Sequence, residues 1–188
     1  MSGDVTAVVL CGGSSQRFGG DKLGASIAGR TVLDSLISGI PPGWEVVCVG
    51  PRRETPRRVG WTREHPHGSG PLAAVAAGIA GVTSLITVVV AGDMPFAGSS
   101  LERLATTLTA APGDVCAVVG VDAEDHANPL LAAYRTDSLR AALPPDPQGR
   151  AAKLLLGLRH ELLPVSQRQG ADVDTRADLD RLRRETSF

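Results

Sequence analysis

The sequence predicts an α/β fold, a doubly wound and mostly parallel sheet with helices on both faces. Apolar, β-branched runs alternate along the chain with stretches in which apolar residues recur every three or four positions. The runs lack the polar alternation of half-exposed strands, which indicates strands that are buried on both faces. This order of elements favours right-handed βαβ crossovers. No repeat or linker interrupts it, so we expect one domain over residues 1–188.

Each expected element follows from its own pattern. The runs TAVVL, EVVCVG, LITVVVAG and DVCAVVGV indicate buried strands, and NPLLAAYR indicates a later one. These strands are expected at 6–10, 45–50, 85–92, 114–121 and 128–135. Helical spacing of apolar residues predicts helices at 31–40, 70–81, 99–111, 136–143, 150–160 and 177–186. Ser99 or Ser100 is expected to cap the third helix. Thr175 is expected to cap the last, with Asp178 in its first turn.

Composition and charge argue against several classes of protein. A net charge of −1 and six aromatic residues give no clustered positive surface, so nucleic acid is not an expected partner. No apolar run reaches the length of a membrane span, and an aspartate precedes the first apolar run where a secretory signal has basic residues. Three cysteines, far apart in the sequence, favour reduced thiols in a cytoplasmic protein over disulfides or zinc ligands.

The segment LCGGSSQRFGGDK, residues 10–22, combines four glycines with Arg17 and with Lys22, one of only two lysines in the chain. It follows the first expected strand, at the edge where open α/β sheets bind ligands. Glycines let backbone N–H groups approach a phosphate, and the two cations neutralise its charge. A flexible crossover is the alternative interpretation. The segment fits neither GxxxxGK[ST] nor GxGxxG, which excludes those two phosphate-binding loops.

Carboxylates occur at two further places where a sheet of this kind would form a site. Asp93 directly follows the most apolar strand in VVVAGDMPF, where its oxygens suit a hard cation such as Mg²⁺. A simple turn aspartate is the alternative. Asp172 and Asp174 lie two positions apart in ADVDTRADL, on the same face of an extended segment. They either complete a metal site with Asp93 or cap the helix that follows.

The glycine segment resembles the pattern L-x-G-G-x-x-x-R-[MF]-G-x-D-K, found in the nucleotidyltransferase family that contains molybdenum cofactor guanylyltransferase. The matching residues are Leu10, Gly12, Gly13, Arg17, Phe18, Gly19, Asp21 and Lys22. DMPF at 93–96 is similar to the family's D-x-P-[FY], and GPLA at 70–73 to its G-P-L-A-G. The resemblance implies a Rossmann-like nucleotidyltransferase fold. It also implies transfer of GMP from GTP to the phosphate of molybdopterin, with release of pyrophosphate.

The same resemblance implies roles for individual residues. Arg17, Lys22 and Asp93 would be catalytic, and Asp93 with Asp174 would bind Mg²⁺. The residues expected to contact nucleotide are Leu10, Cys11, Gly12, Gly13, Lys22, Gly50, His65, Gly70, Pro71, Leu72 and Asp93. Those expected near the acceptor are Asn128, Pro129, Arg150 and Lys153, the last two with an ordinary solvated helix start as the alternative. GTP and molybdopterin are the expected substrates, and molybdoenzymes or cofactor-assembly proteins are the candidate protein partners.

Three places depart from the family pattern. His65 stands where guanylyltransferases tend to have an aspartate before G-P-L-A, although it is equally consistent with an exposed loop histidine. Gly50 stands where an asparagine often follows the second strand. Asp172 and Asp174 replace the asparagines of N-V-N-T-P, and an aspartate before the threonine is more like the cytidylyltransferase relatives. The alternatives are therefore a molybdopterin cytidylyltransferase, a transferase for another phosphorylated acceptor, and a nucleotide-binding protein without catalysis.

Overall fold

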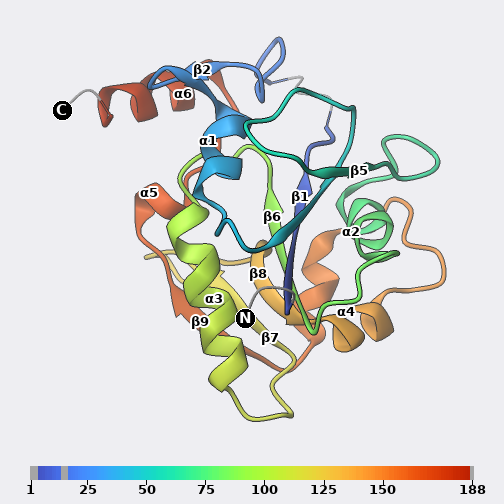
Figure 1. Ribbon diagram of the computed structural model, residues 1–188. Coiled ribbons are helices and arrows are strands. Elements are labelled where there is room, and N and C mark those ends of the chain that lie inside the picture. Colours follow the sequence, from blue (N-terminus) through green and yellow to red (C-terminus); the bar gives the residue numbers. More distant parts are fainter. Residues whose placement is uncertain (1–3, 14–16, 187–188) are drawn as a thin grey trace.

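A computed structural model describes residues 4–13 and 17–186 of the chain. Its main feature is a seven-stranded sheet in the order β5-β4-β1-β6-β8-β7-β9 (Figure 1). The strands are β1 (Val5–Leu10), β4 (Glu45–Val49), β5 (Gly60–Thr62), β6 (Ile86–Ala91), β7 (Ala117–Val121), β8 (Ala127–Arg135) and β9 (His160–Pro164). β1 lies between β4 and β6 and is parallel to both, whereas β8 runs antiparallel between β6 and β7. The predicted, mostly parallel sheet is confirmed.

Helices cover both faces of this sheet, which confirms the doubly wound arrangement. One face packs against α1 (Val32–Gly39), α3 (Gly98–Ala110) and α6 (Arg176–Arg184). The other face packs against α2 (Pro71–Ile79), α4 (Thr136–Ala142) and the 3₁₀ helix η1 (Ala152–Gly157). Ala7 and Val9 of β1 enter the first core, and Val8 and Leu10 enter the second. Successive side chains of a strand point to opposite faces, so a strand covered on both sides is apolar at nearly every position.

Short elements complete the fold. A hairpin of β2 (Ser26–Ile27) and β3 (Arg30–Thr31) leads into α1, and α5 (Gln167–Gly170) follows β9. Thr31 caps α1, because its side chain accepts a hydrogen bond from the Asp34 N–H. Within the described part of the chain, no helix is both long and apolar enough to cross a membrane.

Two predicted elements need correction. The helix expected at 150–160 is wrong: the chain forms η1 and then β9, which pairs in parallel with β7. The leucines at 154–156 do lie in a helix, but only in the short 3₁₀ helix η1. The chain then enters β9 at His160, which completes the ladder of β7, a strand that would otherwise be a free edge. The cap expected from Ser99 or Ser100 is also wrong, since α3 begins at Gly98 and its N-cap is Ala97. The cap predicted at the last helix is confirmed, since Thr175 and Asp178 form a capping box on α6.

The carboxyl ends of β1, β4 and β6 meet the start of β8 at one edge of the sheet. The Cys11 N–H donates to the Val49 carbonyl at 2.8 Å, which joins the first loop to the end of β4. Gly50 has φ +147°, and a Cβ there would lie 2.7–2.9 Å from backbone atoms of Cys11 and Gly12. The glycine at 50 therefore lets two loops touch, and it fixes where the glycine-rich segment leaves β1.

Candidate nucleotide-binding site

A pocket of about 340 Å³ opens at this edge of the sheet. Three parts of the predicted site line it: the glycine segment, the start of α2 and the carboxylate after β6. The lining residues are Leu10, Gly12, Gly13, Glu64, Gly68, Gly70, Pro71, Ala74, Ala91, Asp93 and Leu130. Six of the residues predicted to contact nucleotide therefore share one pocket. A second hollow, of about 690 Å³, lies over residues 52–61. Its residue Arg57 donates hydrogen bonds to the carbonyls of Ile40, Pro41 and Trp44, so this arginine already holds the backbone around it.

Glycines with positive φ line this pocket at two places. Gly13 has φ +128° and Gly70 has φ +94°, conformations that favour glycine. Gly70 is the N-cap of α2 and Pro71 its first residue, and no side chain caps the helix. The free amides of the first turn, with the positive end of the helix dipole, attract an anion. The pocket thus offers backbone donors where the sequence predicts phosphate.

Glu64 is a pocket residue that the sequence analysis missed. Only 8% of it is exposed, and its Oε1 accepts a hydrogen bond from the Gly68 N–H at 2.9 Å. Its Oε2 is buried and has no hydrogen-bond partner among the described residues. His65, the residue predicted at this position, is exposed and stacks against His67 with ring centroids 4.8 Å apart. The resemblance implies an acidic residue a few positions before G-P-L-A. Glu64 is acidic and lines the pocket, so it matches this feature better than His65 does.

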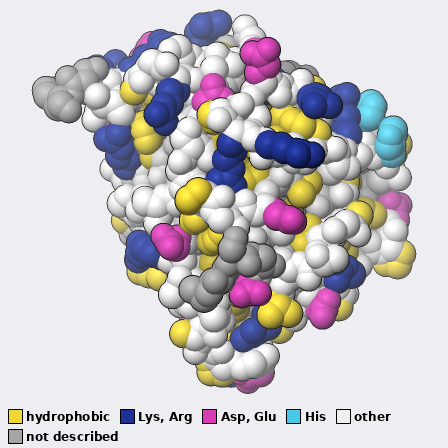
Figure 2. Space-filling model, viewed as in Figure 1, with side chains coloured by type: hydrophobic (Ala, Val, Ile, Leu, Met, Phe, Trp, Pro, Cys, Tyr) yellow, Lys and Arg dark blue, Asp and Glu magenta, His cyan; other side chains and the backbone are white. Residues whose placement is uncertain are grey.

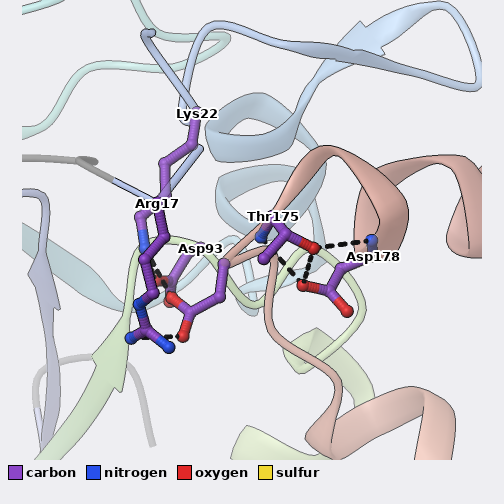
Figure 3. A network of polar contacts seen from close by, with 6 residues as sticks. Arg17, Lys22, Asp93, Thr175 and Asp178 are labelled. Atoms are coloured by element: carbon purple, nitrogen blue, oxygen red, sulfur yellow. Dashed lines mark hydrogen bonds and ion pairs between the residues drawn. The ribbon is translucent and has the colours of Figure 1, made fainter. Parts of the chain in front are cut away.

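Lys22 lies at the centre of a charged network beside the pocket (Figure 3). Its Nζ donates to Asp93 Oδ2 at 2.5 Å and to Asp174 Oδ1 at 3.2 Å. Arg17 reaches the other oxygen of Asp174 at 2.7 Å. The Val173 N–H also donates to the Asp93 carbonyl at 3.0 Å, which holds the chain before α6 against the loop after β6. Tertiary structure therefore brings together the four charged residues predicted for catalysis and metal binding.

The charges in this network affect one another. Burial alone would lower the pKa of Lys22, but the hydrogen bonds and charges of Asp93 and Asp174 outweigh it and raise the pKa. Lys22 therefore stays protonated at neutral pH. Partial desolvation raises the pKa of Asp172, and the nearby charges of Asp93 and Asp174 raise it further, although the residue keeps contact with solvent. Three carboxylates, those of Asp93, Asp172 and Asp174, thus lie near Lys22.

The residues of this network also suit a divalent cation. The described residues contain no group of three or more His, Cys, Asp or Glu side chains arranged to hold a metal ion. Mg²⁺, however, is commonly bound by one or two carboxylates together with waters and substrate phosphates. Asp93 and Asp174 supply two carboxylates, and Asp93 Oδ1 is buried without a hydrogen-bond partner in the described chain. The donor set therefore fits a magnesium–nucleotide complex.

Asp21, next to Lys22, is held by the β4–β5 loop. Arg53 Nη1 lies 2.5 Å from Asp21 Oδ2. This hydrogen bond lowers the pKa of Asp21, helped by backbone N–H groups at Gly24 and Leu23. The carboxylate thus closes the turn that follows Lys22, and the arginine anchors that turn to a different part of the sheet.

The remaining predicted residues surround the pocket at different depths. Cys11 and Leu72 are buried, and the pKa of the Cys11 thiol is raised by a hydrogen bond with Cys48 and by burial. Asn128 lies beside Met94, next to Asp93, and its Oδ1 accepts from the Leu130 N–H. The Pro129 carbonyl accepts a hydrogen bond from buried Tyr134.

The two basic residues predicted near the acceptor are both exposed. Arg150 lies in the loop that joins the pocket rim, where the Gly149 N–H donates to the Ser69 carbonyl at 2.7 Å. Its own Nε donates to the Asp146 carbonyl. Lys153 lies on η1.

The fold and the site together define a nucleotide-binding α/β protein, with glycine backbone, paired cations and carboxylates at the carboxyl edge of the sheet. The chain belongs to the family described as the MobA-like NTP transferase domain, whose model matches residues 7–162. That match ends before Asp174 and α6.

Comparison with individual proteins agrees with this family. The chain is 33% identical over 126 residues to a molybdenum cofactor guanylyltransferase from Mesorhizobium japonicum, a match that spans 61% of each protein. It resembles the crystal structure of molybdopterin-guanine dinucleotide biosynthesis protein A from Archaeoglobus fulgidus, with 23% identity and a TM-score of 0.74 over 97% of this chain and 98% of that one. A nucleotidyl transferase from Methanothermobacter thermautotrophicus matches at 20% identity, with a TM-score of 0.77 over 96% of both chains. These structural likenesses show the shared fold.

Proposed function

We propose that this chain is a magnesium-dependent guanylyltransferase that transfers GMP from GTP to the phosphate of molybdopterin and releases pyrophosphate. The observation that carries the proposal is the unpaired carboxylate oxygen of Glu64 in the same pocket as Gly12, Gly13 and Asp93. The pocket thus combines an acceptor for a nucleoside base, Glu64, with Asp93, which pairs with the proposed phosphate-binding residue Lys22. The curated relative, named a molybdenum cofactor guanylyltransferase, supports the choice of acceptor.

Glu64 favours guanine for a chemical reason. Guanine presents two neighbouring donors, N1–H and the exocyclic N2–H₂, to a carboxylate. Cytosine presents one donor beside an acceptor, and that acceptor repels a carboxylate oxygen. A buried, unpaired acceptor discriminates strongly between ligands that satisfy it and ligands that do not.

The reaction needs no general base from the protein. An oxygen of the molybdopterin phosphate attacks the α-phosphorus of GTP, a new P–O bond forms, and the bond between the α-phosphorus and the bridging oxygen to the β-phosphate breaks. The attacking oxygen is already anionic, because the second pKa of a phosphate monoester is about 6. Pyrophosphate leaves with the electron pair of the broken bond.

The protein must therefore align two anions and stabilise the charge that develops on the leaving group. Lys22 and Arg17 would exchange their carboxylate partners for phosphate oxygens, and the Gly12 and Gly13 amides would hold the same group. Mg²⁺, when bound, supplies positive charge at the phosphate oxygens, and Asp93 and Asp174 are the residues that would hold it. Asn128 beside Met94 is our candidate contact for the acceptor, with Pro129, Arg150 and Lys153 further out.

A molybdopterin cytidylyltransferase is the second candidate, because Asp174 contacts Lys22 where the guanylyltransferase pattern has asparagine. The three free cysteines fit the reducing cytoplasm in which we place the reaction. Molybdoenzymes or cofactor-assembly proteins would be the partners that receive the product.

Pyrophosphate release from GTP, CTP, ATP and UTP, each with Mg²⁺ and with or without molybdopterin, tests the proposal. We expect release from GTP only, and only when molybdopterin is present. Preference for CTP would assign the second candidate. If no nucleotide gives pyrophosphate release, the proposal that the chain is a transferase acting on molybdopterin is wrong.

A further inference from the structure

The helix α6 lies outside the part of the chain that the family model matches, yet it contacts the loop around Lys22 at Phe18 and at Ser26. Figure 1 shows α6 beside the β2 hairpin, directly after the segment that carries Asp174. Basic side chains are numerous over the upper part of the molecule, where these elements lie (Figure 2). The helix α6 carries Arg176, Arg181, Arg183 and Arg184, and the first and third of these contact residues on either side of Lys22.

The first contact lies four residues before Lys22. The guanidinium of Arg176 is 5.1 Å from the centre of the Phe18 ring, within the range of a cation–π interaction. Phe18 is buried, and it packs in the same core as Leu179 and Leu182 of α6. The helix therefore packs against the core through Leu179 and Leu182, and Arg176 lies over the ring of Phe18.

The second contact lies four residues after Lys22. Arg183 donates from Nε at 2.9 Å and from Nη2 at 2.8 Å to the Ser26 carbonyl. Arg176 and Arg183 are seven residues apart on a helix, so they lie on one face, and that face spans the loop from residue 18 to residue 26.

Between these points side-chain contacts also hold the loop, since Asp21 pairs with Arg53 and Lys22 pairs with Asp93 and Asp174. For the described residues, the backbone hydrogen bonds within and around it begin at Lys22, whose carbonyl accepts from Ala25 N–H at 3.3 Å. Leu23 and Ala25 then accept from the start of α1. The stretch from Arg17 to Asp21 depends on side-chain contacts, and the chain that leads into α6 supplies those to Arg17 and Phe18.

We propose that α6 is a brace for the phosphate-binding segment, and that Arg176 and Arg183 are positioning residues that act on Lys22 through Phe18 and Ser26. This inference rests on the proposed function for its consequence, nucleotide binding, but the brace itself is a property of the loop. A loosened segment must be reordered when a triphosphate binds, so the ordering cost weakens binding.

The test compares Arg183→Ala with Arg184→Ala, a matched control that removes the next arginine of the same exposed helix end. Backbone hydrogen exchange over residues 17–27 is measured first, followed by the Kd for Mg–GTP by titration calorimetry and by kcat and KM. We expect faster exchange in the loop of Arg183→Ala and a roughly tenfold rise in Kd and KM with kcat nearly unchanged, whereas Arg184→Ala matches the parent chain. Arg183→Lys, which keeps one donor for the Ser26 carbonyl, should recover part of the loss.

Each other result overturns a specific claim. Equal exchange in Arg183→Ala and Arg184→Ala would show that α6 does not brace the loop. Faster exchange with unchanged Kd would show a structural contact without a positioning role. If Arg183→Ala unfolds, Arg176→Ala and Arg183→Lys carry the same comparison. A parent chain that binds Mg–GTP but transfers nothing to molybdopterin contradicts the proposed function and leaves the brace supported by exchange and Kd.

Discussion

Lys22 Nζ lies 2.5 Å from Asp93 Oδ2, and the two residues are 71 positions apart in the sequence. The pair joins the glycine segment after β1 to the loop after β6 and is mostly shielded from solvent, with side chains 13% and 17% exposed. Asp174 meets the same amine from the C-terminal segment. The lysine thus pairs with the two carboxylates that we propose as magnesium ligands.

Removal of either member of this pair should impair catalysis. We expect Lys22→Ala and Asp93→Ala each to reduce turnover about 100-fold, because each removes charge stabilisation from the transition state. The double variant should lose much less than the product of the two single losses, since the residues act as a unit. Steady-state rates of pyrophosphate release measure this. Arg159→Ala, which removes a surface pair with Asp114, serves as the control. Near-parent rates in folded variants would contradict the catalytic assignment.

Glu64 should determine the choice of base. Glu64→Gln places an amide N–H₂ where guanine also presents donors, so we expect kcat/KM for GTP to fall about 10- to 100-fold while the low rates with CTP and ATP stay within about twofold. Glu54→Gln, an exposed carboxylate in the neighbouring loop, is the matched control. His65→Ala tests the residue that the sequence pattern favours. A large loss in His65→Ala with a normal Glu64→Gln enzyme would transfer the role back to the histidine.

The ion pair of Asp21 and Arg53 should contribute stability that depends on pH. Arg53 lowers the pKa of Asp21 below its ordinary value of 3.8, so the folded state favours the charged carboxylate. That stabilisation is present above pH 3.8 and disappears as the pH falls through the lowered pKa, where both states bind the proton. Arg53→Gln should therefore lose stability relative to the parent chain at pH 7 and approach it at low pH.

Urea unfolding from pH 7 to pH 2.5 follows this difference. Arg52→Gln provides the comparison, because that arginine is exposed and makes no ion pair with another described residue. Its difference from the parent chain should not vary with the protonation of Asp21. A pH-independent effect of Arg53→Gln would assign the arginine a packing role only.

Gly50 should tolerate no side chain. Its φ is +147°, and a Cβ added there would approach the Cys11–Gly12 backbone to 2.7–2.9 Å, so Gly50→Ala must displace the glycine segment. We expect a loss of about 2 kcal/mol of unfolding free energy together with weaker nucleotide binding. Gly113→Ala, where a methyl group meets no atom within 4 Å, should change neither. A fully stable Gly50→Ala protein with parent-like binding would show that the two loops can separate freely.

Local sequence patterns are enough to predict the alternation of strands and helices, because burial on both faces of the sheet leaves continuous apolar runs such as VVVAG. They also predict the cap at Thr175, which depends on residues three positions apart. Local patterns of this kind carry their own physical signal. The sequence also marks Lys22 and Asp93 by local signals, the first as one of two lysines in the chain, placed in a glycine-rich segment, and the second as a carboxylate just after a buried strand.

Packing of the whole chain sets the features that local patterns do not predict. The helix expected up to residue 160 ends at Gly157, and the chain continues into β9, whose partner β7 lies about 40 residues earlier, at a distance that no local pattern describes. Glu64 became a pocket residue because the loop before α2 folds inward and buries it, while His65 next to it remains in solvent. The contact of α6 with β2 likewise joins Arg183 to Ser26 across 157 positions. Burial and long-range contact are set by packing of the whole chain, and sequence spacing does not record them.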